Sequence, residues 1–195
     1  LTEDLEATVN WLGRTVPGVP LIYSGFSLGG SVTLNTLAKW GDALPEGSAG
    51  TVVVSVPLDL HEADAALRRR GINQLYVKYF MRGFHRMWER KHAAYPELYP
   101  ADGLRGVRTV RDFDEKWTGP NFGYAGAEDY YTAASSGSKL EQIKLPGLVV
   151  HAVDDPFVPL TIEVRQALVD HPRLELLISD HGGHVGFLAR RPARQ

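Results

Sequence analysis

The chain has 195 residues, 44% hydrophobic and 23% charged, which is typical of a globular domain with a sizeable core. Its formal net charge of -2 gives no overall attraction for nucleic acid or an anionic membrane, and without a run of about 18 apolar residues we expect no stable membrane insertion. The absence of cysteine excludes disulfides, thiol catalysis and cysteine-ligated metal sites.

The first part of the chain predicts a helix, a strand, a second helix and a second strand. Leu5, Val9 and Leu12 recur at spacings of four and three, which predicts an amphipathic helix over 2–12 that ends at "PGVP". A buried strand over 19–26, a helix over 28–40 and a β-branched strand over 50–56 follow. A strand, a helix and a strand in this order predict a parallel pair with a right-handed crossover.

The alternation of strands and helices is interrupted after residue 56. Helices rich in arginine and aromatic residues are expected over 62–70 and 75–93, followed by an irregular region with "YPELYP", "GPNFGYAG" and "EDYY". A strand over 146–153, a helix over 160–169 and a strand over 173–178 then resume the pattern. An interruption of about 80 residues is far longer than an ordinary connection. We therefore predict a core formed by 1–56 and 139–195, with a helical cap, 57–138, inserted into it.

The segment "GFSLG", residues 25–29, fits the pattern G-x-S-x-G between a predicted strand and a predicted helix. In this setting Ser27 stands in a tight turn, and side chains two positions before and after it would collide with backbone, which glycine avoids. The amide of Leu28 lies at the start of the helix, where it can stabilise an oxyanion. A glycine-rich turn with a helix-capping serine is the alternative interpretation.

A serine nucleophile needs a general base to take its proton and a carboxylate to orient that base. The segments "HAVDDPFVP" and "SDHGGHVGF" place Asp154 and Asp155 after one predicted strand, and His181 and His184 after the next. Hydrolases built on this serine turn have the same chain order of serine, acid and histidine. The spacing therefore predicts a Ser-Asp-His set and leaves two candidates each for the acid and the base.

Together with "SGFSLGG" and "EDYY", these segments resemble the YheT-like branch of the α/β-hydrolase superfamily, a group of esterases with animal lipid-hydrolysing relatives. The resemblance covers nearly the whole chain. It implies an α/β class and an α/β-hydrolase fold, in which helices flank a mostly parallel sheet and a helical cap is inserted.

The resemblance also selects among the candidate site residues. On the family pattern the nucleophile is Ser27 and the acid is Asp155, which stands three positions before a Val-Pro pair. The base is His184, which follows a glycine. Asp154 is then a neighbour that hydrogen-bonds the loop or caps the next helix, and His181 supports the turn.

The chain departs from the family pattern at its beginning. Members of the family have several strands ahead of the nucleophile, and a loop there donates a second oxyanion N–H. This sequence starts directly with a helical pattern, so we expect those strands to be absent, the strand before Ser27 to face an open edge, and Leu28 to be the remaining oxyanion donor. Loss of one such donor costs about 3 kcal/mol of transition-state stabilisation. We interpret the chain as a fragment of a larger enzyme.

The function implied by the resemblance is hydrolysis of a carboxylic ester through an acyl-enzyme, with small to medium acyl esters, lipid esters included, as substrates. No cofactor is needed, and the remaining histidines show no metal-ligand spacing. Acyl transfer by the same residues, a non-catalytic binding protein and an inactive fragment are the alternatives. We expect a small-molecule ester as the partner, no nucleic acid and a cytoplasmic location in a bacterium; the oligomeric state is left open.

A basic run and an aromatic pattern mark the predicted cap helices. We interpret the basic run as a solvated face paired with acidic neighbours; the alternative is a surface for anionic head groups or lipid carboxylates. The aromatic residues predict cap core, with one or two lining an acyl pocket. The basic residues are Arg68, Arg69, Arg70, Lys78, Arg82, Arg86, Arg90 and Lys91, and the aromatic ones are Tyr76, Tyr79, Phe80, Phe84 and Trp88.

Overall fold

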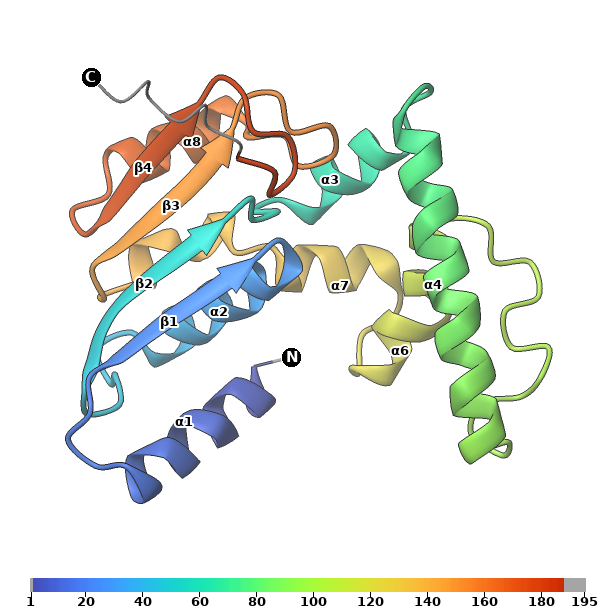
Figure 1. Ribbon diagram of the computed structural model, residues 1–195, viewed down its shortest axis with the longest axis horizontal. Helices are drawn as coiled ribbons and strands as arrows, with labels where there is room; N and C mark the ends of the chain where they lie inside the picture. Colours follow the sequence, from blue (N-terminus) through green and yellow to red (C-terminus); the bar gives the residue numbers. More distant parts are fainter. Residues whose placement is uncertain (1, 188–195) are drawn as a thin grey trace, which may run out of the picture. The chain divides into compact units, whose positions relative to one another are not determined.

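The computed structural model describes residues 2–187, which form two compact units (Figure 1). The first unit combines the described residues of 1–60 with those of 134–195, and the second unit is the segment 61–133 between them. The two pieces of the first unit meet because the chain returns to the same sheet after the insertion.

The first unit is built on a parallel sheet of β1 (Leu21–Phe26), β2 (Ser48–Val54), β3 (Gly147–Ala152) and β4 (Leu174–Ser179). The strands lie side by side in chain order, and each neighbouring pair is parallel. The predicted strands are confirmed, with ends shifted by up to two residues. In the described part of the chain β1 pairs with β2 alone, so the strand before Ser27 lies at an edge, as expected.

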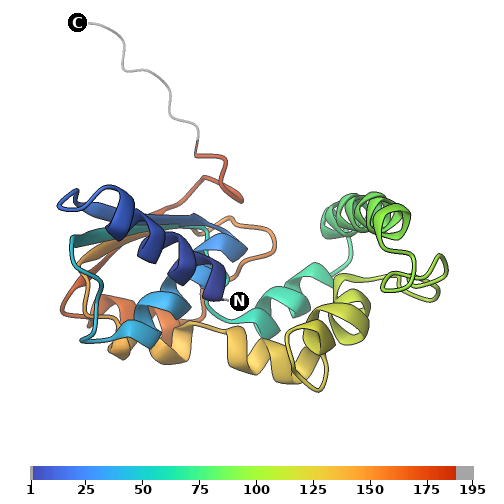
Figure 2. The same ribbon diagram turned by 90° about the horizontal axis from the view of Figure 1, so that it is seen from below.

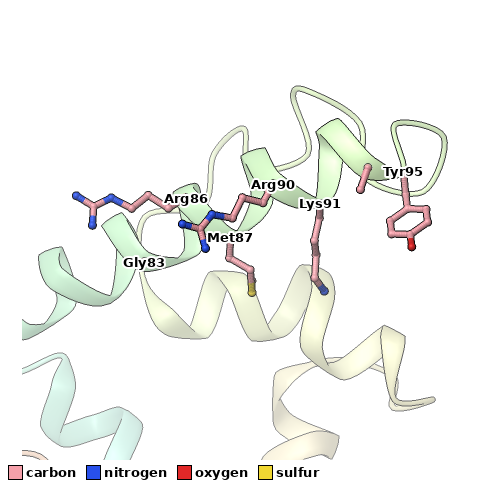
Figure 3. Close-up of a pocket in the computed structure, with 7 residues that line it drawn as sticks. Gly83, Arg86, Met87, Arg90, Lys91 and Tyr95 are labelled. Atoms are coloured by element: carbon pink, nitrogen blue, oxygen red, sulfur yellow. The ribbon is translucent and has the colours of Figure 1, made fainter.

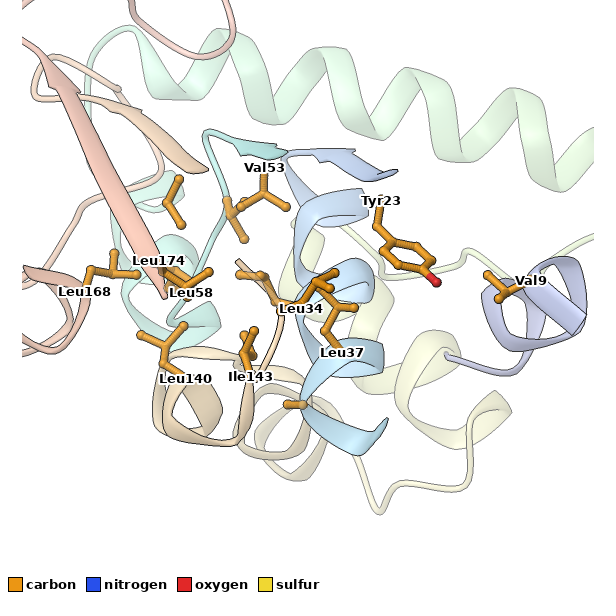
Figure 4. Packing of buried hydrophobic residues seen from close by; sticks show 14 residues of the cluster. Val9, Tyr23, Leu34, Leu37, Val53, Leu58, Leu140, Ile143, Leu168 and Leu174 are labelled. Carbon is orange, nitrogen blue, oxygen red and sulfur yellow. The ribbon is translucent and has the colours of Figure 1, made fainter. Parts of the chain in front are cut away.

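Helices of the first unit cover one face of this sheet. They are α2 (Leu28–Trp40), the 3-10 helix η2 (Gly137–Gln142) and α8 (Ile162–Val169), and Figure 2 shows α2 and α8 on the same side of the strands. The first helix, α1 (Glu3–Thr15), lies beyond the edge strand β1 and packs against α2 (Figure 1). Alternate strand residues such as Tyr23, Val53 and Val149 point into this core. There they meet Leu34 and Leu37 of α2 (Figure 4). Side chains of period two on the strands thus pack against helical side chains of period 3.6.

The opposite face of the sheet is exposed in the described residues. Ile22 of β1 and Leu177 of β4 point to this face and are 68% and 54% exposed. Parallel sheets are normally covered on both faces. This part of the chain therefore leaves one apolar face of its sheet open.

The second unit is helical. Its elements are α3 (Leu60–Leu67), α4 (Asn73–Ala94), α5 (Val110–Phe113), the π-helix η1 (Asp114–Thr118), α6 (Gly119–Asn121) and α7 (Ala127–Ala134). A small core around Trp88, Leu104 and Phe113 holds α4 against the loop and the short helices that follow it. The indole N–H of Trp88 donates to the carbonyl of Pro100 over 2.9 Å, which fixes the loop after α4.

Both helices expected at the start of this segment are present, but their ends and the structure of "EDYY" differ from the expectation. The helix predicted over 62–70 ends at Leu67, and the next begins two residues earlier than expected, at Asn73, whose side-chain amide donates to the carbonyl of Ala66 over 2.7 Å. The motif "EDYY" is not irregular but lies in α7. The amide of Ala127 donates to the carboxylate of Glu115 over 2.8 Å, so a residue distant in sequence satisfies the first turn of this helix.

Candidate active site

The turn from β1 into α2 holds Ser27 in a strained conformation. Its φ is 51° and its ψ is -127°, values that non-glycine residues rarely adopt, and its amide donates to the carbonyl of Val54 over 2.9 Å. A Cβ at Gly25 would lie 2.6 Å from the carbonyl oxygen of Gly29, and one at Gly30 would lie 2.3 Å from a methyl group of Val56. Close approach of backbone at Gly25 and of the Val56 side chain at Gly30 therefore favours glycine at both positions.

The third glycine does not follow the expectation. A Cβ built at Gly29 meets nothing within 4 Å, so the predicted collision two residues after the serine is wrong for the described part of the chain. Gly29 lies in the first turn of α2, and a Cβ built on it points away from Gly25. The close contact is between the backbone of Gly29 and a side chain built at Gly25.

The side chains of Ser27, His184 and Asp155 form a continuous hydrogen-bonded row. Nε2 of His184 lies 2.9 Å from Oγ of Ser27, and its Nδ1 lies 2.8 Å from Oδ2 of Asp155. A carboxylate beside Nδ1 requires a proton there, which leaves Nε2 to accept the proton of the hydroxyl. The structure thus brings together three residues from loops up to 157 positions apart.

Burial and backbone hydrogen bonds orient Asp155. Its side chain is 1% exposed and that of His184 is 15% exposed. Oδ1 of Asp155 accepts from the amides of Phe157 and Val158 over 3.2 and 3.0 Å, which leaves Oδ2 for the imidazole. The ring of Phe157 packs on the imidazole with 4.2 Å between the ring centroids. Asp155 and His184 can therefore rotate little.

Asp154 lies next to this row but has a different set of partners. Its Oδ1 accepts from the amides of Gly182 and Gly183 over 2.9 and 2.7 Å, and its Oδ2 lies 3.3 Å from Nδ1 of His181. The bond from Gly183 is the main cause that lowers the pKa of Asp154. The carboxylate thus supports the turn that carries His184, while His181 points almost fully into solvent.

Ser55 is a residue of this region that sequence reasoning missed. It follows β2, is fully buried and has a φ of 51°, and its Oγ accepts from the amide of Val185 over 3.3 Å. Val185, directly after His184, also has a positive φ, 64°. Backbone strain of this kind clusters at functional sites. The sequence could have indicated Ser55 by its position near the end of a predicted strand, because the carboxyl ends of parallel strands meet at one edge of the sheet.

The amide of Leu28 is available as a donor. Leu28 is the first residue of α2, and in the described part of the chain its N–H has no acceptor, whereas the amides of Gly30 and Ser31 bond the carbonyl of Ser27. An amide at a helix N-terminus beside the hydroxyl can bind an oxyanion.

A nearby histidine belongs to the core of the first unit. His151 of β3 is 3% exposed, and burial lowers its pKa, which favours a neutral ring.

Among residues 2–187, no group of three or more metal-ligating side chains is placed to hold a metal ion. In the same range no helix has both the length and the apolar character to cross a bilayer.

Comparison with known proteins finds relatives that carry the names of esterases and phospholipases. No protein-family profile matches the chain. An Escherichia coli protein that carries the name of an esterase, YheT, is 37% identical over 189 residues, 96% of this chain and 54% of that protein. Phospholipase ABHD3 of Mus musculus is 33% identical over 188 residues, 96% of this chain and 45% of that protein. The chain thus spans about half the length of the curated relatives that it matches.

Solved structures show a corresponding likeness in fold. The Pyrococcus furiosus esterase Pf2001 matches with a TM-score of 0.51 and 21% identity over 94% of this chain and 53% of that one. At this identity the match speaks for the fold alone. The α/β-hydrolase fold expected from the sequence motifs is confirmed, as is the resemblance to the YheT-like proteins.

Proposed function

The chain is a homologue of the YheT-like esterases with the α/β-hydrolase fold, and from this premise we propose that the protein hydrolyses carboxylic esters with Ser27 as nucleophile. The observation that carries the proposal is the row from Ser27 through His184 to Asp155, with 2.9 and 2.8 Å between the polar atoms. A serine that merely capped a helix would need neither partner, and Ser27 makes no side-chain bond to its own helix.

In the first half of the reaction Oγ of Ser27 attacks the ester carbonyl carbon while Nε2 of His184 takes the hydroxyl proton. Asp155 holds the imidazole in the required tautomer and stabilises the imidazolium that forms. The amide of Leu28 stabilises the oxyanion of the tetrahedral intermediate. Collapse of this intermediate releases the alcohol, which takes the proton from His184.

In the second half His184 deprotonates a water molecule that attacks the acyl-enzyme. The second tetrahedral intermediate expels Oγ of Ser27, which recovers its proton, and the carboxylic acid leaves. No step needs a cofactor. Transfer to an alcohol would follow the same path with the alcohol in place of water, and products formed with an added alcohol distinguish the two.

We infer lipid esters as the substrate class, because the relatives include a protein named a phospholipase. Within this class we predict acyl chains of small to medium length. We also propose that residues 57–138 act as the cap over the substrate site. A chain-length series of p-nitrophenyl esters measures the preference directly, since the rate constant for each ester reports how well its acyl group is bound.

The first test is labelling by a fluorophosphonate probe, which reacts with activated serines. We expect labelling that disappears in Ser27→Ala and persists in Ser24→Ala, a matched control at an exposed position of the same strand. The experiment should be run on this chain and on any longer product of its gene. Absence of labelling in well-folded protein, while a known esterase in the same tube is labelled, would overturn the proposal and favour a binding protein.

A further inference from the structure

The outer face of α4 combines exposed apolar side chains with a row of arginines. We define the α4 outer face as Ile72, at the residue before the helix, with Leu75, Tyr79, Arg82, Arg86 and Arg90. These positions are three or four residues apart and so lie on one stripe of the helix. Leu75 is 59% exposed and Tyr79 is 71% exposed. The opposite stripe, with Val77 and Trp88, is buried in the second unit.

The arginines of this face have no acidic partners. In the described residues Arg82, Arg86 and Arg90 make no ion pair, and Glu89 is the single acidic residue of α4. Arg68, earlier in the basic run, does pair with Asp64 over 3.0 Å. The interpretation of the whole run as a face paired with acidic neighbours is therefore wrong for the part of it that lies on α4.

A groove runs along the flank of this helix. Its volume is about 490 Å³, and Arg86 and Arg90 reach along it beside Met87 (Figure 3). Lys91 and Tyr95 line its other end. Gly83 also lines the groove, and a Cβ built there would meet nothing within 4 Å.

We propose that the α4 outer face docks on the surface of an anionic phospholipid bilayer. Leu75 and Tyr79 enter the boundary between head groups and acyl chains, where apolar and aromatic side chains are stabilised. Arg82, Arg86 and Arg90 pair with lipid phosphates, and the groove beside Arg86 and Arg90 accommodates one head group.

Charge complementarity selects this occupant. A nucleic acid would neutralise the arginines but leave Leu75 and Ile72 in water, while a neutral apolar partner would bury arginines without compensating charge. An anionic bilayer satisfies both kinds of side chain along a helix of 22 residues.

The proposal does not rest on Ser27, so the variant Ser27→Ala should bind vesicles as the unchanged protein does.

Sedimentation with vesicles tests this docking. The protein is mixed with vesicles of phosphatidylcholine, or of phosphatidylcholine with phosphatidylglycerol, at increasing salt concentration. We expect binding to the anionic vesicles that weakens with salt. Each arginine near an anionic surface contributes about a fivefold increase in partitioning. The triple variant Arg82→Gln, Arg86→Gln, Arg90→Gln should therefore bind about a hundredfold more weakly.

Two further variants separate the contributions. Leu75→Gln with Tyr79→Gln should weaken binding about tenfold or more at every salt concentration, because apolar burial is not screened. A matched control, Arg14→Gln with Arg165→Gln and Arg173→Gln, removes three exposed cations of the first unit and should leave binding unchanged. All the changed side chains are exposed, so circular dichroism should report unchanged folds.

Several results would overturn the proposal. They are no binding to anionic vesicles, equal binding to neutral ones, or an equal loss in the Arg14, Arg165 and Arg173 control. Tighter binding to a nucleic acid than to the vesicles at the same salt concentration would assign the arginines to that partner. Vesicle binding without fluorophosphonate labelling would leave this proposal standing and remove the esterase, whereas labelling without vesicle binding would do the reverse.

Discussion

At the scale of single residues, the glycines of the turn around Ser27 differ in whether their surroundings leave room for a side chain. Gly25 faces the backbone of Gly29 and Gly30, whereas Gly29 faces open space in the described part of the chain. Two glycines that look equivalent in the motif thus have different physical roles.

Gly25→Ala and Gly29→Ala make this difference measurable. The first should cost about 1–3 kcal/mol of folding stability by overpacking and should displace Ser27, so that fluorophosphonate labelling slows strongly. The second should keep stability or raise it by up to about 1 kcal/mol, because alanine favours the helix. Urea denaturation and labelling rates check both. Equal effects of the two substitutions would contradict the steric explanation.

At the same scale, we expect Asp154 to act as a positioning residue for His184. Asp154→Ala removes the acceptor of the Gly182 and Gly183 amides, so kcat for an ester should fall about tenfold or more with little change in KM. Asp154→Asn retains an oxygen acceptor and should recover most of the rate. His181→Ala, which changes an exposed side chain, should be close to neutral. A change in KM with kcat unaltered would argue against a positioning role for Asp154.

The lowered pKa of Asp154 gives this residue a definite pH dependence. Its carboxylate stabilises the fold above the unfolded-state pKa of about 3.9, and that contribution is lost as pH falls through the lower folded-state pKa. The stability difference between the unchanged protein and Asp154→Asn should therefore be present at neutral pH and vanish in strong acid. Urea denaturation at a series of pH values measures it, and a difference that grows in acid would contradict the assignment.

At the scale of elements, the carboxyl ends of the four strands bring the candidate site residues together. Ser27 follows β1, Ser55 follows β2, Asp155 follows β3 and His184 follows β4. In a parallel sheet these ends lie at one edge, which is where such folds place their reactive groups. The order of strands alone therefore brings the chemistry to one place, and the loops decide the hydrogen bonds.

The π-helix η1 of the second unit contains a buried acid with its own pH signature. Burial raises the pKa of Asp114, whose Oδ2 accepts a hydrogen bond from the hydroxyl of Tyr131 over 2.8 Å. The carboxyl of Asp114 holds its proton more tightly in the folded state than in the unfolded chain. The stabilisation of the fold by this proton is therefore complete below the unfolded-state pKa of about 3.9. It is lost as pH rises through the folded-state pKa.

Asp114→Asn removes this titration and keeps an oxygen for the Tyr131 hydroxyl. We expect the variant to gain stability relative to the unchanged protein as pH rises from about 4 towards neutrality. Urea denaturation at a series of pH values measures the difference in stability between the two proteins. Asp102→Asn, at an exposed position, serves as the control, and an opposite slope with pH would contradict the predicted direction.

At the scale of the whole molecule, the open face of the sheet exposes apolar side chains of the first unit. Ile22 and Leu177 stand on this face with their side chains largely exposed. Exposed apolar surface of this kind binds hydrophobic dyes and promotes association. Ile22→Thr with Leu177→Thr should lower anilinonaphthalene sulfonate fluorescence with little loss of stability. Val169→Thr, which changes an exposed position of α8, should not.

The sequence by itself determined the strands and the main helices, and it placed Ser27, two aspartates and two histidines after predicted strands, because periodicity and turn motifs are local signals. Only the tertiary structure decided how the ambiguous residues are used. Asp155 rather than Asp154 faces His184, Gly29 meets no neighbour, Ser55 holds the histidine turn, and Glu115 caps α7. The Asp155 and Ser55 contacts join groups 29 and 130 residues apart, and all four cases depend on directions in space that local pattern does not encode.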